Sequence, residues 1–280
     1  MGKIKIVTDS TMDIPESVLE QCGVEVVPLS FIIDGQTYLD RVDITPAQFI
    51  EKMMASSELP KTSQPAVGSF VEVYDRLGAD GSTVLSIHMT SGMSGTYASA
   101  CTAATLTSTH VEVVDSTYMS QATGFQVLEA AKMAQEGCSL EEIKARLEEV
   151  RDHSRLYVVV DTLDNLVKGG RIGKGKALIG SLLNIKPIAT LEEGVYVPVS
   201  KARSHSQVVK TLTKYFQEEV NGKTIKAVGI SHAKALEVAT KLKESIQEVS
   251  GFENITVYDT TPVISTHTGV GAIGFSYFAE

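Results

Sequence analysis

The pattern of apolar and polar residues divides the first half of the chain into alternating strands and helices. Apolar runs typical of buried strands occupy residues 3–7, 24–28, 83–87 and 111–114. Amphipathic stretches, with apolar residues every three or four positions, predict helices over residues 46–55, 67–77, 96–106, 118–135 and 140–152. Such alternation is typical of a parallel sheet with helices on both faces. We therefore predict an α/β, Rossmann-like domain over residues 1–154.

The pattern changes after about residue 154. Two β-prone runs, 185–191 and 195–200, flank an acidic turn at 192–194, which predicts a hairpin. Helices and strands then alternate, and a small-residue loop over 266–271 leads into a last strand. We expect a smaller α+β domain with a mixed sheet over residues 155–280. It should abut the first domain, because no low-complexity linker separates them.

Residues suited to turns and caps mark several element boundaries. The Asp-Gly pair at 34–35 lies between two apolar runs, as in a β-hairpin. Asp13 is placed to cap the first helix. Thr62 or Ser63 is placed to cap the helix predicted over residues 67–77. A further short helix is predicted over residues 177–183.

A predicted strand, a tight loop and a helix start follow one another between residues 83 and 106. The loop, residues 90–96, is rich in glycine and in hydroxyl side chains. A helix start carries unpaired backbone N–H groups and a partial positive charge. Glycine lets an anion approach those groups closely, and hydroxyls add donors. The segment therefore predicts a binding site for an oxyanion.

Three other polar segments, at 8–11, 62–64 and 115–116, lie next to predicted strands or helices. Ligands of parallel α/β sheets bind beyond the carboxyl ends of the strands. We therefore expect these segments to meet the 90–96 loop at one edge of the sheet.

Composition narrows the classes of ligand and partner. The net charge is −9 and no cluster of Lys and Arg is present, so nucleic acid is not an expected partner. No apolar run approaches the ~18 residues of a membrane span, and residues 3–7 resemble a strand rather than a signal peptide. Cys22, Cys101 and Cys138 have no metal-ligand spacing. We expect a cytoplasmic protein with reduced thiols, no membrane anchor and no metal site.

Two glycine-rich segments match nucleotide-binding motifs but lack their context. Residues 269–274 fit G-x-G-x-x-G, yet only six residues follow in this sequence, too few for a βαβ unit. Residues 170–177 nearly fit the P-loop pattern, but Ala177 replaces the hydroxyl that binds Mg²⁺. We therefore expect no nucleotide cofactor. The cations of this second segment form either a solvated surface or a contact for phosphate or an acidic partner: Arg171, Lys174 and Lys176.

A second chemistry fits the loop at 90–96. Residues 92–96 nearly match the nucleophile elbow G-x-S-x-G. With Ser94 as nucleophile, His267 as base and Asp9 or Asp115 as its orienting carboxylate, a serine hydrolase of acyl esters is the alternative. The other histidines have no metal-ligand spacing.

Six short motifs, taken in order, resemble the DegV family over essentially the whole chain. They are Ile6-Val-Thr-Asp-Ser10, Thr62-Ser-Gln-Pro65, Thr90 to Tyr97, Val114-Asp-Ser116, Lys168 to Gly173 and His267 to Gly271. The family usually has serine where this chain has Thr90, and proline where it has Val270. The family is similar to the fatty-acid-binding subunit (FakB type) of bacterial fatty acid kinase.

This resemblance implies a function and a set of site residues. In that system the binding protein holds a long-chain fatty acid, and a separate kinase subunit phosphorylates its carboxylate with ATP. The acyl phosphate then enters phospholipid synthesis. Carried onto this sequence, the family pattern places the carboxylate against Thr62, Ser94 and Gly95, near His267, with Arg171 facing the kinase or the product phosphate. The chain would then be a binding subunit without a cofactor, and not itself an enzyme.

The physical chemistry of a fatty acid agrees with these residues. A buried carboxylate needs several donors, which hydroxyls and a helix start supply. At ~0.8 kcal/mol per buried CH₂, a tail of about 14 to 18 carbons gains roughly 10 kcal/mol, so bound lipid should survive purification. The tail pocket itself is not identified by the sequence. Its candidates are explained equally well as core residues: Phe31, Ile33, Ile179, Leu182 and Phe275.

Overall fold

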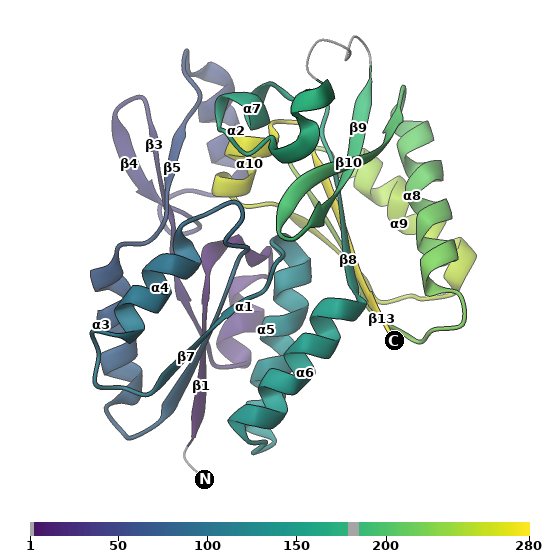
Figure 1. Cartoon of the computed structure of the whole chain (residues 1–280). Helices are drawn as coiled ribbons and strands as arrows, with labels where there is room; N and C mark the ends of the chain where they lie inside the picture. Colours follow the sequence, from purple (N-terminus) through teal and green to yellow (C-terminus); the bar gives the residue numbers. More distant parts are fainter. Residues whose placement is uncertain (1–2, 179–184) are drawn as a thin grey trace.

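A four-stranded parallel sheet forms the N-terminal part of the molecule (Figure 1). The computed structural model describes residues 3–178 and 185–280. The strands β1 (Ile4–Asp9), β2 (Val24–Val27), β6 (Thr83–His88) and β7 (Val111–Asp115) lie in the order β2-β1-β6-β7, each parallel to its neighbours. The predicted parallel sheet is confirmed, and polar segments follow β1, β6 and β7 at its carboxyl edge.

Helices cover both faces of this sheet. One face carries α1 (Glu16–Gln21), α5 (Ser120–Gln135) and α6 (Leu140–His153). The other carries α3 (Val67–Gly78) and α4 (Thr96–Ala104). Neighbouring strand residues point to opposite faces, so Ile6 packs with the first group and Val7 with the second. This arrangement confirms the doubly covered α/β architecture.

A six-stranded mixed sheet forms the C-terminal part. Its strands are β8 (Ser154–Val159), β9 (Lys186–Glu192), β10 (Val195–Ala202), β11 (Ile225–His232), β12 (Ile255–Asp259) and β13 (Ile273–Ala279). They lie in the order β10-β9-β8-β13-β11-β12, with β11 and β12 parallel and the other neighbours antiparallel. The β9–β10 hairpin forms as predicted. Two helices, α8 (His205–Val220) and α9 (Leu236–Ser250), cover one face.

A small antiparallel sheet joins β4 (Gln36–Leu39), β3 (Ser30–Ile33) and β5 (Lys61–Ser63) in that order. The predicted hairpin at residues 34–35 connects β3 and β4. The prediction that Thr62 or Ser63 caps a helix is wrong, because both residues belong to β5 and pair with β3. The next helix, α3, begins after Ala66, which makes no side-chain capping bond.

Three short helices lie beside the small sheet: α2 (Pro46–Ala55), α7 (Asp164–Lys168) and α10 (Pro262–Thr268) (Figure 1). Helix α10 packs against α2, α7, β3 and β5. The sequence predicted a loop from residue 266 onward, but His267 lies in the last turn of α10. The start of this helix has the usual features of a helix N-terminus. The Thr261 side chain accepts a hydrogen bond from the Ile264 N–H, and Pro262 opens the first turn.

Of two further predictions about helices, one is wrong and the other lies for the most part outside the described residues. Asp13 does not cap the first helix, because it is buried in a left-handed conformation (φ 51°) with its carboxylate bonded to Ser120 and Thr260. Helix α1 begins instead after Pro15, without a side-chain cap. The helix predicted over 177–183 lies for the most part outside the described residues, and Gly173–Leu178 before it form a 3₁₀ helix.

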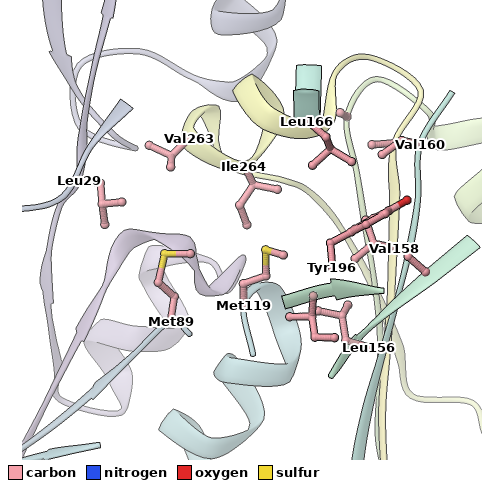
Figure 2. Close-up of a cluster of buried hydrophobic side chains, with 14 of the residues drawn as sticks. Leu29, Met89, Met119, Leu156, Val158, Val160, Leu166, Tyr196, Val263 and Ile264 are labelled. Carbon is pink, nitrogen blue, oxygen red and sulfur yellow. The ribbon is translucent and has the colours of Figure 1, made fainter. Parts of the chain in front are cut away.

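Helix α5 lies between the two larger sheets (Figure 1). It packs on β1 and β6 of the parallel sheet and on β8, β11 and β13 of the mixed sheet. A cluster of buried apolar side chains fills the space beside it, under α10 (Figure 2). Both parts of the molecule therefore contribute to one central core, and this core surrounds the candidate site.

Candidate ligand-binding site

A cavity opens within the central core, where the carboxyl edge of the parallel sheet meets α10 and the mixed sheet. Its free volume is only about 40 Å³, well below the ~300–1,000 Å³ usual for small-molecule sites, so a larger ligand requires the wall side chains to move. Figure 2 shows Met89, Met119, Val263 and Ile264 pointing toward one another in this core. The wall consists of Leu29, Thr62, Ser63, Gln64, Met89, Met93, Ser94, Met119, Val158, Leu166, Arg171, Tyr196, Val263, Ile264, His267 and Thr268.

A second cavity, with about 20 Å³ of free volume, adjoins the first. The two share wall residues Met119, Val158, Ile264 and Thr268, and the second is lined almost entirely by apolar atoms. The charged and ring-nitrogen groups, Arg171 and His267, belong to the wall of the first cavity. The two cavities thus make an elongated space that is polar toward one end.

Thr62 and His267 meet at the polar end. Thr62 Oγ1 and His267 Nε2 lie 2.8 Å apart and are hydrogen bonded. Pairing between β5 and β3 holds Thr62, and the last turn of α10 holds His267. The fold therefore brings together two residues that the sequence predicted separately.

Burial and a neighbouring cation keep His267 neutral near pH 7. Burial lowers its pKa and the positive charge of Arg171 lowers it further, to about 4. Its Nδ1 atom is buried and has no hydrogen-bond partner among the described residues. A Cβ atom on Gly169 would stand only 2.3 Å from this nitrogen, so glycine leaves room for the ring. The neutral ring has one N–H to donate and one nitrogen lone pair to accept.

Ser94 and Gly95 form the start of α4 beside the cavity. Ser94 Oγ accepts a hydrogen bond from the Thr96 N–H at 3.3 Å and lies 2.8 Å from Thr96 Oγ1. Ser94 lines the cavity, whereas Gly95 packs against Gln64, whose Nε2 would be 2.8 Å from an added Cβ atom. The predicted order of strand, loop and helix start is confirmed, and Gly95 serves close packing of the loop.

Arg171 reaches the polar end from the C-terminal part. Its Nε donates to the Met93 carbonyl at 3.1 Å, and its Nη1 donates to the Gly169 carbonyl at 2.6 Å. Lys174 instead pairs with Glu192 at 3.1 Å, and both of these side chains are exposed. The predicted group of cations is therefore divided, with Arg171 in the cavity wall and Lys174 in solvent.

The polar segments predicted to meet at the edge of the sheet do so. The Met89 N–H donates to Asp9 Oδ2 at 2.9 Å, and the Ser91 N–H donates to Asp115 Oδ2 at 3.1 Å. Gln64 joins them through its packing on the 90–96 loop. These contacts fix both sides of the loop that presents Ser94.

The same contacts remove the basis for a serine hydrolase. Asp9 Oδ2 bonds to His88 Nδ1 at 3.2 Å, and Asp115 accepts backbone N–H groups, so both candidate carboxylates act away from His267. Ser94 bonds within its own loop rather than to His267. A nucleophile needs its base within hydrogen-bond reach and a group that orients that base. The hydrolase alternative is therefore not supported.

Several wall residues were missed by sequence reasoning. Met89 and Met93 flank the start of the predicted loop, and such flexible apolar side chains suit an irregular ligand pocket. Tyr196, from the β9–β10 hairpin, carried no sequence signal because only the tertiary fold brings it here. Its buried hydroxyl has no hydrogen-bond partner in the described part of the chain, and burial raises its pKa.

The candidate tail contacts have different outcomes. Phe31 and Ile33 belong to the central core but not to the walls of the two cavities. Phe275 points to the other face of the mixed sheet and packs with α8, so it is a core residue. Ile179 and Leu182 lie outside the described residues.

Among residues 3–178 and 185–280, no group of three His, Cys, Asp or Glu side chains is placed to hold a metal ion. Within those same ranges, none of the helices is both long enough and apolar enough to span a bilayer. Cys22, Cys101 and Cys138 are free thiols. Residues 269–272 form the turn from α10 into β13, and residues 273 and 274 already belong to that strand, so this motif does not open a helix.

Comparison with protein families identifies relatives over nearly the full length. The family model described as "Uncharacterised protein, DegV family" matches residues 3–280. The DegV domain-containing protein SA1258 of Staphylococcus aureus is 43% identical over 274 residues, which cover 98% of each chain.

Solved structures with the same fold include two that are 34% identical to this chain. A DegV family protein from Thermus thermophilus, described with its fatty acid binding, superimposes with a TM-score of 0.93 at 34% identity, covering 99% of this chain and 100% of that chain. DegV from Bacillus subtilis, described as a fatty acid binding protein, gives a TM-score of 0.89 at 34% identity, with the same coverage.

Proposed function

The chain belongs to the DegV family, and from that premise we propose that it binds a long-chain fatty acid. The tail follows the path of the two adjoining cavities, whose flexible wall side chains move apart to admit it, and the carboxylate lies beside Thr62 and His267. The observation that carries this proposal is the hydrogen-bonded Thr62–His267 pair at one end of a mostly apolar cavity. Two relatives at 34% identity are described as fatty-acid-binding proteins, which supports the same ligand class.

The polar end offers the donors that a buried carboxylate requires. The Ser94 hydroxyl can donate one hydrogen bond, and the Thr62–His267 pair can donate a second, because one of the two protons of the pair is used in the bond between them. Arg171 adds a positive charge, and the start of α4 adds backbone N–H groups. Hydrogen bonds to a charged group each contribute about 1.5–3 kcal/mol, so several of them offset the loss of hydration.

The apolar walls account for the binding energy of the tail. Met89, Met119, Val158, Val263 and Ile264 line the space beyond the polar end. Each CH₂ transferred from water into such a wall contributes about 0.8 kcal/mol. Long-chain acids should therefore bind more tightly than short ones.

We further propose that a separate ATP-dependent kinase subunit phosphorylates the bound carboxylate. Arg171 would stabilise the phosphate that forms, because its guanidinium lies at the same end as the carboxylate donors. The protein then acts as the binding subunit, and the acyl phosphate it carries serves phospholipid synthesis. We assign it to the cytoplasm, where its three free thiols stay reduced.

Mass spectrometry of the denatured recombinant protein tests the ligand directly. We expect an acid of roughly 14 to 18 carbons, because such tails bind strongly enough to survive purification. The substitution Thr62→Val should lower the bound fraction and the affinity about tenfold, since it removes a donor and leaves His267 Nε2 unpaired.

Thr102→Val is the matched control, because Thr102 bonds within α4 at an exposed position away from the cavity. Absence of lipid in the wild-type protein, together with no binding of added palmitate or oleate, would contradict the proposal.

Arg171→Ala tests the kinase step. Acyl phosphate formation by the kinase subunit with ATP should fall at least about tenfold, because a cation beside the developing charge is lost. Because Arg171 also adds positive charge beside the carboxylate, the rates are compared at saturating fatty acid. Lys174→Ala removes a nearby exposed cation and serves as the control. Equal rates for Arg171→Ala and the wild type would remove Arg171 from the phosphate site.

A further inference from the structure

Two buried carboxylates, Asp13 and Asp40, hold the beginning of α10. Their exposed fractions are 3% and 0%. Asp40 Oδ1 accepts the Val263 N–H at 3.2 Å, and its Oδ2 accepts the Ser10 hydroxyl at 2.6 Å. Asp13 Oδ1 accepts the Thr261 N–H at 3.0 Å. Neither carboxylate lines the fatty-acid cavity, yet together they bind the first turn of α10 to the N-terminal part.

Keeping these charges inside the protein is costly. Burial raises the pKa of Asp40 to about 7, even though the bonds from Ser10 and Val263 act in the opposite direction. Burial also raises the pKa of Asp13, and the negative charge of an ionised Asp13 raises the pKa of Asp40. Apolar residues of similar volume can replace buried charges without loss of stability. Here the carboxylates also accept bonds from buried donors, so their burial cost is partly offset. Perturbed carboxyl groups are concentrated at functional sites.

Helix α10 connects the carboxylates to the ligand site. The helix has seven residues, with Val263 and Ile264 in the cavity wall and His267 in the last turn. Asn165 Nδ2 donates to the carbonyl of residue 266 at 2.9 Å and steadies the far end. Thr62 belongs to a separate element, β5, so any movement of α10 changes the distance between Thr62 and His267.

We propose that Asp40, together with Asp13, is a positioning residue for the carboxylate site. By fixing the first turn of α10, it places His267 at hydrogen-bond distance from Thr62. The identity of the ligand rests on the proposed function above, but the Thr62–His267 bond joins two side chains of this chain and can be measured whether or not palmitate is added.

Asp40→Asn separates positioning from stability, because asparagine keeps the shape and one acceptor oxygen but removes the charge. The unfolding midpoint at pH 8 should equal or exceed that of the wild type, since a buried charge is no longer formed. The imidazole nitrogen resonances of His267, measured by NMR on isotopically labelled protein, should shift. The affinity for palmitate should fall about tenfold, comparable to the loss of one hydrogen bond to a charged group.

Asp80→Asn is the matched control, because Asp80 is an exposed carboxylate bonded to Lys5. It should leave the His267 resonances and the palmitate affinity unchanged. A folded Asp40→Asn protein with wild-type resonances and wild-type affinity would overturn the proposal.

If the wild-type protein binds no palmitate, the proposed function fails, and the His267 resonances still decide the positioning role. If Asp40→Asn does not fold, Ser10→Ala replaces it with the same two readouts, because Ser10 is the side-chain donor to Asp40. Unchanged His267 resonances in Ser10→Ala would then overturn the proposal.

Discussion

Gly169→Ala is expected to remove most of the fatty-acid affinity while the protein stays folded. Gly169 has helical backbone angles (φ −77°, ψ −10°), which alanine adopts readily. The added methyl group, however, would stand 2.3 Å from His267 Nδ1, so the ring must move away from Thr62. Loss of one hydrogen bond to a charged group costs about 1.5–3 kcal/mol, which corresponds to roughly a 10- to 150-fold weaker affinity. Calorimetric titration with palmitate measures this change.

The neighbouring glycine provides a control with the opposite result. Gly170 has φ +74°, and no atom of the described chain lies within 4 Å of an added Cβ. Gly170→Ala should therefore cost roughly 1 kcal/mol in unfolding free energy through backbone strain but keep the palmitate affinity. Wild-type affinity in Gly169→Ala would show that the position of the His267 ring does not control binding.

Asp9→Ala should be among the most destabilising single substitutions in the N-terminal part. Asp9 is fully buried and accepts hydrogen bonds from Thr11 N–H at 3.0 Å and Met89 N–H at 2.9 Å, with His88 Nδ1 at 3.2 Å. Removing one partner of a buried pair leaves the other without compensation and costs about 3–5 kcal/mol. Urea unfolding at pH 7 measures the loss. Asp80→Asn, at an exposed position, should change the stability far less.

The pH dependence of stability gives a second test of the Asp9 network. Burial alone would raise the pKa of Asp9, but the hydrogen bond and charge of His88, with bonds from Thr11 and Met89, outweigh it and hold the pKa below 3.8. Below that pH the unfolded chain binds more protons than the folded one. The stability supplied by ionised Asp9 is therefore complete above about pH 4 and is lost as the pH falls further. The difference in unfolding free energy between wild type and Asp9→Asn should shrink as the pH falls below about 4, and a difference that stays constant or grows over that acidic range would contradict this assignment.

The periodic elements of the fold were predictable because each buries one face. Ile6 and Val7 alternate between two apolar layers, and the helices of the N-terminal part repeat their apolar positions every three or four residues. Helix α10 escaped prediction because its residues Ser265, Thr266 and Thr268 are buried yet polar, so no apolar stripe marks it. Strand β5 was not predicted because it has only three residues, and its pairing with β3 exists only in the folded protein.

The candidate site likewise contains residues that local sequence motifs identify and contacts that only the folded chain creates. Thr62, Ser94, Arg171 and His267 were identified by short motifs and by resemblance to a family, and all four line one cavity. The contacts of Asp40 could not be deduced in this way. Its partner Val263 lies 223 positions away, and nothing local to either residue indicates the bond. Motifs reveal residues that share a loop, whereas contacts between distant segments need the folded chain.

The position of β13 in the mixed sheet governs when the binding cavity can exist during synthesis. This strand lies between β8 and β11, although more than a hundred residues separate it from β8 in the chain. It also covers one side of α5, and its Ile273 and Gly274 line the second cavity. A growing chain that has not yet released residues 273–279 from the ribosome lacks the middle strand and part of the cavity wall. The wall of the proposed lipid site is therefore complete only after this strand has emerged.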